Sequence, residues 1–421
     1  MDFCYPATPK AFNVMFKPAG PDCNLKCTYC YYLEKKEIVT SPADPAEHGK
    51  ILEKYIREYI AAQQVPLVYF IWQGGEPSLA GLPYFRKALE LQQTYAGDKE
   101  IINVLQTNGT LLNEEWCRFL GENGFLTGIS LDDPEHVHDR YRKYGDGRPS
   151  WKKTMHGLEL LHRFRIEFNT LSTINHYSAE HPEEVYNFLK NSGSRYMQFI
   201  PVVERQVASA KPIMLVHPLN KGDAELTPWS LKPGQLGNFL TRIFDRWVRN
   251  DVGKVFVQHF DTALANRAGA MPGLCTFSPR CGDATVLEHN GNLYCCDHFV
   301  YPDYYLGNIL ETPLSTLMSS VKLAAFGQNK LAALTRQCRE CEVRYACHGD
   351  CPKHRFCRSR DGEPGHSYLC EDYSRFFRYI TPHLDFMVRQ IERQQPPAGI
   401  MEQMKANEGR ENPADLQAPQ N

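Results

Sequence analysis

From Ala11 to about Val203, short apolar runs rich in β-branched and aromatic residues alternate with longer segments of helical period. This alternation is typical of repeated strand–helix units and predicts an α/β fold built on a parallel sheet. Six strands are expected, at Ala11 to Lys17, Leu67 to Trp72, Ile101 to Gln106, Phe125 to Leu131, Ile166 to Thr173 and Tyr196 to Val203. Intervening helices are expected at Leu82 to Tyr95, Asn113 to Glu122, Trp151 to Arg165 and Pro182 to Lys190.

Unusual polar or glycine-rich residues follow four of these strands directly. They are a cysteine cluster, Gln73 to Pro77, Thr107 to Thr110, and Ser130 to Asp132. In a parallel barrel the carboxyl ends of the strands converge on one face, so residues far apart in sequence can surround one ligand there. Any one such loop could be an ordinary turn, but four in succession favour a functional site.

The first cysteine cluster has the spacing Cys23-x3-Cys27-x2-Cys30. Three thiolates within one short loop can wrap a single inorganic centre. Structural zinc sites are usually closed by four protein ligands, and no His or Cys lies just downstream to complete one. An iron–sulfur cluster held by three cysteines leaves one iron open to a substrate or cofactor. The spacing therefore favours iron–sulfur, with zinc as the alternative.

The second cysteine region supplies eight further candidate ligands. They are spaced as Cys275-x5-Cys281-x14-Cys296 and Cys338-x2-Cys341-x5-Cys347-x3-Cys351-x18-Cys370. Eight thiolates fill two cubane clusters completely, which suits electron transfer or structure. Two zinc sites of ribbon or treble-clef type are the alternative. Cys295 and Cys357 are extra thiols, so spacing alone leaves Cys295 and Cys296 open as alternative ligands.

Composition limits the partners and the compartment. With 47 Lys+Arg against 49 Asp+Glu and no long run of like charges, the chain has no obvious surface for nucleic acid or anionic lipid. No secretory signal or membrane-length apolar stretch is visible, which predicts a cytoplasmic protein. In a reducing compartment, 15 Cys favour metal or redox chemistry over disulfides.

The first motifs together resemble the radical S-adenosylmethionine (SAM) superfamily. The cysteine spacing follows the first strand, Tyr29 is the aromatic residue before the third Cys, and Gly74-Gly75-Glu76-Pro77 follows the next strand. The resemblance implies a partial (β/α)6 barrel in which the open iron of a 4Fe-4S cluster chelates SAM and cleaves it to a 5'-deoxyadenosyl radical. It also implies site roles: Tyr29 beside the adenine, Gly75 at the methionyl amine, Ser130 and Arg142 at the ribose and carboxylate, and Val203 against the adenine. A surface ion pair is the alternative for Arg142, and a turn residue for Ser130.

The cysteine-rich region resembles the SPASM extension of peptide-modifying radical SAM enzymes. The nearest resemblance is to anaerobic sulfatase-maturating enzymes, through segments such as Gln106 to Leu111, Tyr294 to Phe299 and Leu306 to Ile309. It implies two auxiliary 4Fe-4S clusters with interleaved ligands. Cys275, Cys281, Cys296 and Cys351 would hold one cluster, and Cys338, Cys341, Cys347 and Cys370 the other. Cys296 is preferred over Cys295 because Asp297 then falls in the family's position.

The resemblance implies oxidation of a sulfatase Cys, or Ser, to Cα-formylglycine under anaerobic conditions. The radical would take a Cβ hydrogen, and Asp297 would remove the thiol or hydroxyl proton, its own pKa being raised by partial burial. The alternative for Asp297 is a residue that only hydrogen-bonds near the cluster. The expected partners are an unfolded or nascent sulfatase segment of Cys-x-Pro-x-Arg type and an electron donor such as ferredoxin or flavodoxin. Two alternatives are another SPASM enzyme that forms a thioether or carbon–carbon crosslink, and a zinc-stabilised, non-catalytic binding module.

The expected organisation of the chain is as follows. A radical SAM barrel occupies residues 1–235, a helical connection 236–270, a SPASM-type domain 271–375, a C-terminal helix 376–395 and a flexible tail 396–421. Within the first unit, Arg205 to Gln235 is rich in Pro, Gly and Lys and predicts a long loop, either a lid or a plain insertion.

Overall fold

The computed structural model describes residues 11–40, 46–132, 134–208, 214–218 and 222–408. Within these ranges the N-terminal half forms six parallel strands in sequential order. They are β1 (Asn13–Lys17), β2 (Leu67–Trp72), β3 (Glu100–Thr107), β4 (Leu126–Ser130), β5 (Phe168–Ile174) and β6 (Tyr196–Pro201). The predicted α/β fold with a partial barrel is confirmed, and each strand lies within a few residues of its expected position.

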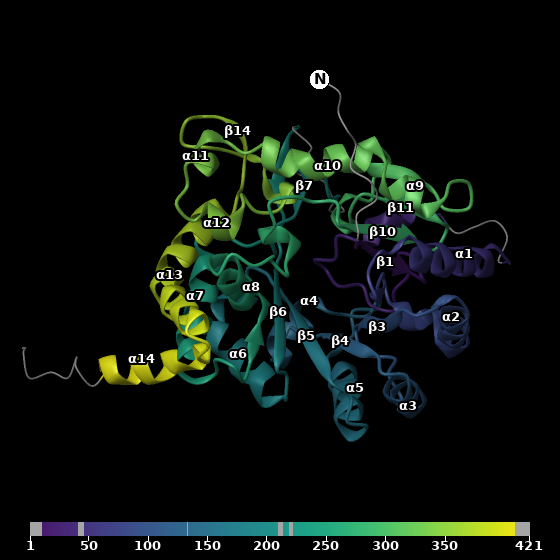
Figure 1. Cartoon of the computed structure of the whole chain (residues 1–421), viewed down its shortest axis with the longest axis horizontal. Helices are drawn as coiled ribbons and strands as arrows, with labels where there is room; N and C mark the ends of the chain where they lie inside the picture. The colour runs from purple at the N-terminus through teal and green to yellow at the C-terminus, as the bar shows by residue number, and fades with distance from the viewer. Residues whose placement is uncertain (1–10, 41–45, 133, 209–213, 219–221, 409–421) are drawn as a thin grey trace, which may run out of the picture.

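Helices cover the outside of this curved sheet (Figure 1). They are α1 (Ala46–Ala62), α2 (Gly81–Tyr95), α3 (Glu114–Glu122), α4 (Glu135–Tyr141), α5 (Trp151–Arg163) and α6 (Pro182–Asn191). Helix α3 begins where Asn113 accepts a hydrogen bond from the backbone N–H of Trp116, a standard N-cap. The sequence analysis did not identify α1 or α4.

The sheet continues beyond the six barrel strands on both sides. Strand β9 (Phe256–Val257) adds in parallel to β6, and β10 (Ala284–Glu288) adds in parallel to β1. Strands β11 (Asn292–Tyr294) and β12 (Tyr305–Asn308) extend that second edge in antiparallel fashion. The cysteine-rich region is therefore joined to the barrel by a continuous hydrogen-bonded sheet, which the sequence analysis did not anticipate.

The remaining elements lie at both edges of the barrel. They are β7 (Arg205–Val207), β8 (Ala224–Leu226), α7 (Gln235–Asn250), α8 (Gln258–Arg267), α9 (Leu314–Met318), α10 (Val321–Ala332), α11 (Arg336–Arg339), α12 (Arg344–Cys347), β13 (Cys357–Arg358), β14 (Pro364–His366), α13 (Cys370–Glu392) and α14 (Ile400–Glu408). Helices α9, α10 and α11 lie across the top of the view in Figure 1, and α13 and α14 run down its left side. Helices α7 and α13 bury apolar faces in the main core, with Phe244, Trp247 and Phe376 in edge or tilted ring contacts. No helix in the described ranges has the combined length and apolarity that a membrane span requires.

Three expectations about irregular segments differ from the structure. The expected loop at 205–235 contains the β7–β8 hairpin and the start of α7, while 209–213 and 219–221 lie outside the described residues. The C-terminal helix begins at Cys370 rather than 376. Residues 400–408 of the expected flexible tail form α14, because Ile400 is buried in the main core; 409–421 lie outside the described residues.

Candidate active site

The loop after β1 carries the three cysteines of the first cluster. Its backbone is hydrogen-bonded to the end of α4 and the residues after it: Lys26 N–H donates to Lys143 O at 2.7 Å, and Thr28 N–H donates to Tyr141 O at 2.9 Å. These two bonds place Arg142 beside the cysteines although it is more than a hundred residues away in sequence. Burial raises the pKa of Cys23 to about 11 and that of Cys30 to about 12. As free thiols these side chains are protonated, so binding a metal centre releases protons.

A cavity of about 190 Å³ opens at the carboxyl ends of the strands. Its wall includes most of the predicted cofactor-binding and catalytic residues: Cys23, Cys27, Cys30, Tyr29, Gly75, Ser130, Arg142 and Asp297. The last of these comes from the cysteine-rich region and the others from the barrel. One cavity thus combines residues from both halves of the chain.

The loop after β2 packs directly on the cysteine loop. Gly75 N–H donates to Gly20 O at 2.9 Å, and a Cβ added at Gly75 would lie 2.0 Å from the Asp22 carbonyl oxygen. Only glycine permits this backbone approach. The neighbouring Glu76 carboxylate is fully buried and accepts hydrogen bonds from Ser78, Thr107 and Asn108, which ties the loops after β2 and β3 together.

Arg142 is buried, so the alternative of a surface ion pair is wrong. Its Nη1 donates to Tyr29 Oη at 2.9 Å, and Tyr29 Oη in turn donates to Asp132. Burial raises the pKa of Tyr29 well above its usual range, so the phenol stays protonated. The Nε of Arg142 is buried without a hydrogen-bond partner. The Arg142 side chain lines the cavity, and its guanidinium charge suits a carboxylate ligand there.

Of the two remaining predicted cofactor-binding residues, Ser130 lines the cavity and Val203 does not. Ser130 ends β4, lines the cavity and accepts a hydrogen bond from Gln106 Nε2 at 3.2 Å. Val203 is buried in the main hydrophobic core, whereas its neighbour Val202 lines the cavity. Ile200 and Val202 line the cavity, whereas Phe199 and Val203 lie in the main core, which is the alternation expected along an extended chain. Strand β6 itself ends at Pro201.

Asp297 follows Cys296 at the start of a 3-10 turn and reaches back to the barrel. Lys17, the last residue of β1, donates to one carboxylate oxygen, and Tyr31 Oη donates to the other. Removal from water is the largest single influence and acts to raise the pKa of Asp297. The Lys17 ammonium, His298 and the hydrogen bonds from Lys17 and Tyr31 together outweigh it and lower that pKa to about 2. The expectation that burial would raise the pKa of this carboxyl is therefore wrong, because the sequence does not reveal the Lys17 contact.

The cysteines of the second region form two spatial groups. Cys296 lies near Cys351 and Cys275, and its pKa is raised first by burial and then by these two thiols. Cys351 in turn lies near Cys275 and Cys281. The other four, Cys338, Cys341, Cys347 and Cys370, line one cavity of about 590 Å³. Cys295 is fully buried in the main core, and no other cysteine is among the groups that shift its pKa. These two spatial groups match the two interleaved ligand sets expected from the resemblance, in the version that uses Cys296 rather than Cys295.

The spacing of these thiols is informative about the metal. A mononuclear zinc site with Zn–S bonds near 2.3 Å brings its sulfurs to about 3.8 Å from one another. In the part of the chain that the structure describes, no three cysteine sulfurs lie within 4.8 Å of one another. The described thiols are therefore not drawn together as three ligands of one zinc ion would be.

Sequence reasoning missed several residues at this site. Lys17 and Tyr31 hold Asp297, and buried Lys353 pairs with Glu204 while its ammonium lies 4.6 Å from the Tyr31 ring centroid. Lys17 could have been singled out from the sequence, because it is a charged residue at the end of a largely apolar strand. Lys353 had no such signal, because its contacts depend on how the two regions pack.

Comparisons with known proteins agree with this geometry. A family pattern described as "Radical SAM superfamily" matches residues 18–189, and one described as "Iron-sulfur cluster-binding domain" matches residues 275–342. The chain is 46% identical over 396 residues to a "Serine-type anaerobic sulfatase-maturating enzyme" of Bacteroides thetaiotaomicron, covering 94% of this chain and 96% of that one. It is 30% identical to a "Cysteine-type anaerobic sulfatase-maturating enzyme" of Clostridium perfringens, covering 88% and 97%.

A solved structure shares the fold. It is described as "Native anSMEcpe with bound AdoMet and Cp18Cys peptide" and superposes with a TM-score of 0.77 at 30% identity, covering 90% of this chain and 99% of that one. Similarity of this extent to an enzyme, together with the two family patterns, leaves no support for the alternative of a non-catalytic zinc module.

Proposed function

Because this chain belongs to the anaerobic sulfatase-maturating enzymes of the radical SAM superfamily, we propose that it oxidises a target Ser or Cys of a sulfatase polypeptide to Cα-formylglycine. Its cofactors are SAM and iron–sulfur clusters. The observation that carries the proposal is the one cavity in which the three cysteines, Arg142 and Asp297 meet. When bound, the cofactors supply a 5'-deoxyadenosyl radical that takes one Cβ hydrogen and auxiliary clusters that accept the second electron.

The barrel residues bind and orient the cofactor in this proposal. Arg142 offers its unpaired Nε–H to the SAM carboxylate, and Ser130 offers its hydroxyl to the ribose. Gly75 contributes backbone contact to the methionyl amine, while Tyr29 and the Val202–Val203 segment lie by the adenine. Cys23, Cys27 and Cys30 hold the SAM-binding cluster.

Asp297 takes the proton of the target side chain. Lys17 and Tyr31 fix both of its oxygens, so the carboxylate is ionised and oriented before the target arrives. A carboxylate with a pKa of about 2 cannot deprotonate a resting thiol or hydroxyl. Loss of the Cβ hydrogen makes that group far more acidic, so proton transfer to Asp297 follows the hydrogen abstraction rather than preceding it.

The second region supplies the auxiliary clusters. Cys275, Cys281, Cys296 and Cys351 are proposed to hold one, and Cys338, Cys341, Cys347 and Cys370 the other, in keeping with the two spatial groups of thiols. Residues 1–235 then form the SAM-binding unit and 271–375 the auxiliary unit. A ferredoxin or flavodoxin in a reducing cytoplasm is the proposed electron donor.

Serine is the favoured target. The serine-type relative from Bacteroides is 46% identical to this chain, against 30% for the cysteine-type relative from Clostridium. A peptide of Cys-x-Pro-x-Arg type and its Ser counterpart, incubated anaerobically with the iron-reconstituted protein, SAM and a strong reductant, test the proposal by mass spectrometry.

Conversion of the target side chain to an aldehyde, with release of 5'-deoxyadenosine, is the expected result for the Ser peptide. Omission of SAM is the control. A thioether or carbon–carbon crosslink in the product would assign the chain to another SPASM chemistry. Release of 5'-deoxyadenosine with an unchanged peptide would contradict the substrate assignment alone.

A further inference from the structure

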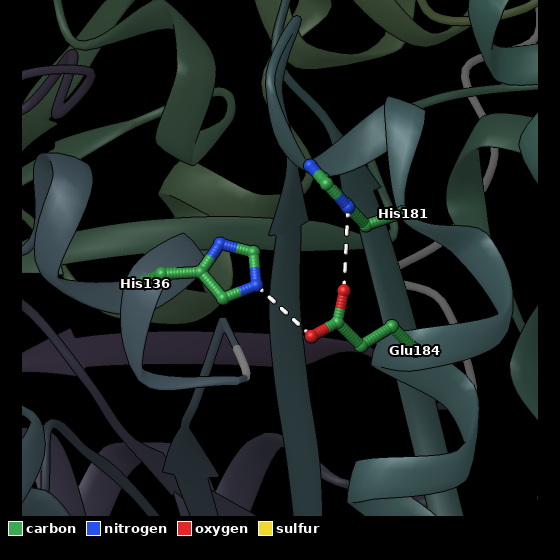
Figure 2. Close-up of side chains that lie close together, drawn as sticks. All are labelled: His136, His181 and Glu184. Carbon is green, nitrogen blue, oxygen red and sulfur yellow. Dashed lines mark hydrogen bonds and ion pairs between the residues drawn. The ribbon is translucent and has the colours of Figure 1, made fainter.

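A separate group of metal-ligating side chains lies outside the active-site cavity, where the segments after β4 and β5 reach the surface. His136 is in the first turn of α4, His181 immediately precedes α6, and Glu184 is in the first turn of α6. One donor atom from each, a ring nitrogen or a carboxylate oxygen, lies within 4.8 Å of the other two. Figure 2 shows the Glu184 carboxylate between the two imidazole rings, with one oxygen toward each.

The distances match the ligand shell of a small divalent ion. Glu184 Oε1 is 3.0 Å from His136 Nε2, and Glu184 Oε2 is 3.3 Å from His181 Nδ1. Tetrahedral zinc with Zn–N and Zn–O bonds of roughly 2.0–2.1 Å separates its ligand atoms by about 3.3 Å. The two distances run to different carboxylate oxygens, so the side chains must rotate to direct one oxygen and both ring nitrogens at one ion.

A neighbouring hydroxyl prepares one histidine for this role. His136 Nδ1 lies 3.0 Å from Tyr177 Oη. In the structure Nε2–H donates to the Glu184 carboxylate. When a metal ion replaces that proton, Nδ1–H can donate to the tyrosine oxygen and the lone pair on Nε2 can bind the ion. Metal-ligating histidines are typically oriented in this way by a partner on the other ring nitrogen. The His136 and His181 rings also make an edge contact, with centroids 5.1 Å apart.

The adjacent arginine pair involves Glu183 rather than Glu184, so the Glu184 carboxylate can serve as a metal ligand. Glu183, the adjacent carboxylate, is paired with Arg246. Arg140 lies near the site, with its guanidinium 4.3 Å from the Tyr177 ring centroid, and Arg242 and Arg375 line the same surface cavity as His181 and Glu184. The exposed fractions of His136 and Glu184, 45% and 49%, leave the site accessible to an ion and to a water as fourth ligand.

We propose that His136, His181 and Glu184 bind a divalent transition-metal ion of the zinc class, with water completing the shell. Two histidines and one carboxylate with an open position are a donor set that zinc and ferrous iron both accept. The ion would join α4 to α6. Because α4 leads directly into Arg142, the bound ion would also restrain the segment that carries this cavity residue. The site is independent of the proposed sulfatase chemistry.

The test measures zinc bound by the iron-reconstituted holoenzyme. The protein is dialysed anaerobically against buffered Zn²⁺, and metal content is read by mass spectrometry for the wild type, His136→Gln, Glu184→Gln and a control, His156→Gln. His156 is an exposed histidine on α5 whose ring lies 3.8 Å from Glu159. The wild type and the control are expected to bind one more zinc per chain than either site variant, at equal iron content.

Two further outcomes sharpen the test. Tyr177→Phe removes the partner of His136 and is expected to weaken zinc binding by about 10- to 100-fold without abolishing it. Equal zinc content in the wild type, His136→Gln and Glu184→Gln would overturn the proposal. Because the two site variants lie on different helices, a folding defect in one leaves the other as an independent measurement.

Discussion

Lys17 and Asp297 are 280 residues apart in sequence and form an ion pair at the candidate active site. Lys17 ends β1 of the barrel, and Asp297 follows Cys296 in the cysteine-rich region. The parallel pairing of β1 with β10 aligns Lys17 with Glu288, which brings the two regions into contact at this point. The proposed proton acceptor is thus supplied by one region and held in its charged state by the other.

Replacement of Asp297 by Asn is expected to preserve SAM cleavage and to suppress aldehyde formation by about 10²- to 10⁴-fold, the usual contribution of a positioned base. Deoxyadenosine and peptide aldehyde are measured in the same reaction. Asp303→Asn, at a nearby exposed carboxylate, is the control and should behave as the wild type. An unchanged aldehyde yield in Asp297→Asn would rule out the base role.

Replacement of Arg142 by Lys keeps the charge but removes the guanidinium fork, including the unpaired Nε–H. Loss of charge-assisted hydrogen bonds predicts SAM binding weaker by about 10- to 100-fold. Equilibrium dialysis with the reconstituted protein measures this. Arg148→Lys, whose exposed side chain pairs with Asp146, should bind SAM normally. Equal affinities in both variants would place SAM elsewhere.

Replacement of Cys296 by Ala is expected to remove the iron of one auxiliary cluster, whereas Cys295→Ala should retain full iron content. The reason is that Cys296 lies near Cys351 and Cys275, while Cys295 is buried in the apolar core. Iron analysis after anaerobic reconstitution distinguishes the two thiols. The reverse pattern would shift the ligand assignment by one residue.

Replacement of Gly75 by Ala places a methyl group 2.0 Å from the Asp22 carbonyl oxygen, so the loop that holds Cys23 must move. We expect loss of the SAM-binding cluster with the auxiliary clusters retained, as read by iron content and electron paramagnetic resonance. Gly49→Ala is the matched control, because its Cβ would meet nothing within 4 Å. A full iron complement in Gly75→Ala would show that the loop tolerates the shift.

Asp261, on α8, gives a prediction for the pH dependence of stability. Burial raises its pKa from 3.8 to about 7. The unfolded chain releases this proton at lower pH than the folded one, so the contribution of Asp261 to stability is complete below pH 4 and is lost as the pH rises toward 7. Asp261→Asn should remove this pH-dependent loss. The difference in thermal midpoint between the variant and the wild type should therefore shift in favour of the variant as the pH rises from 5 to 8. The exposed control, Asp98→Asn, should show no such gain.

The local pattern was sufficient to predict the barrel strands. β2 runs from Leu67 to Trp72 as expected, and α2 and α3 differ from their predicted ranges by a single residue at the start. Strands and helices of this length are specified by the periodicity of their own apolar residues. The same reasoning missed α14, which is short and is anchored by the burial of Ile400 rather than by its own pattern.

Contacts between residues far apart in the sequence could not be predicted from the sequence. Arg142 stands among charged residues in the sequence, which suggested a surface ion pair as the alternative, yet backbone hydrogen bonds to the cysteine loop draw it into the cavity. Val203 was expected to lie against the adenine, and the structure places Val202 in the cavity wall and Val203 in the main core. Register and strand ends depend on neighbouring strands, which a single segment does not encode.

The sequence by itself determined the parallel α/β architecture, the cysteine spacing of the first cluster and the presence of a second, cysteine-rich region, because these depend on residues close together along the chain. Only the tertiary structure decided that Lys17 holds Asp297, that the eight further thiols form two groups, and that His136 meets His181 and Glu184. Those arrangements arise from the packing of distant strands and loops, where the geometry of the folded sheet, rather than spacing along the chain, sets which side chains come within bonding distance.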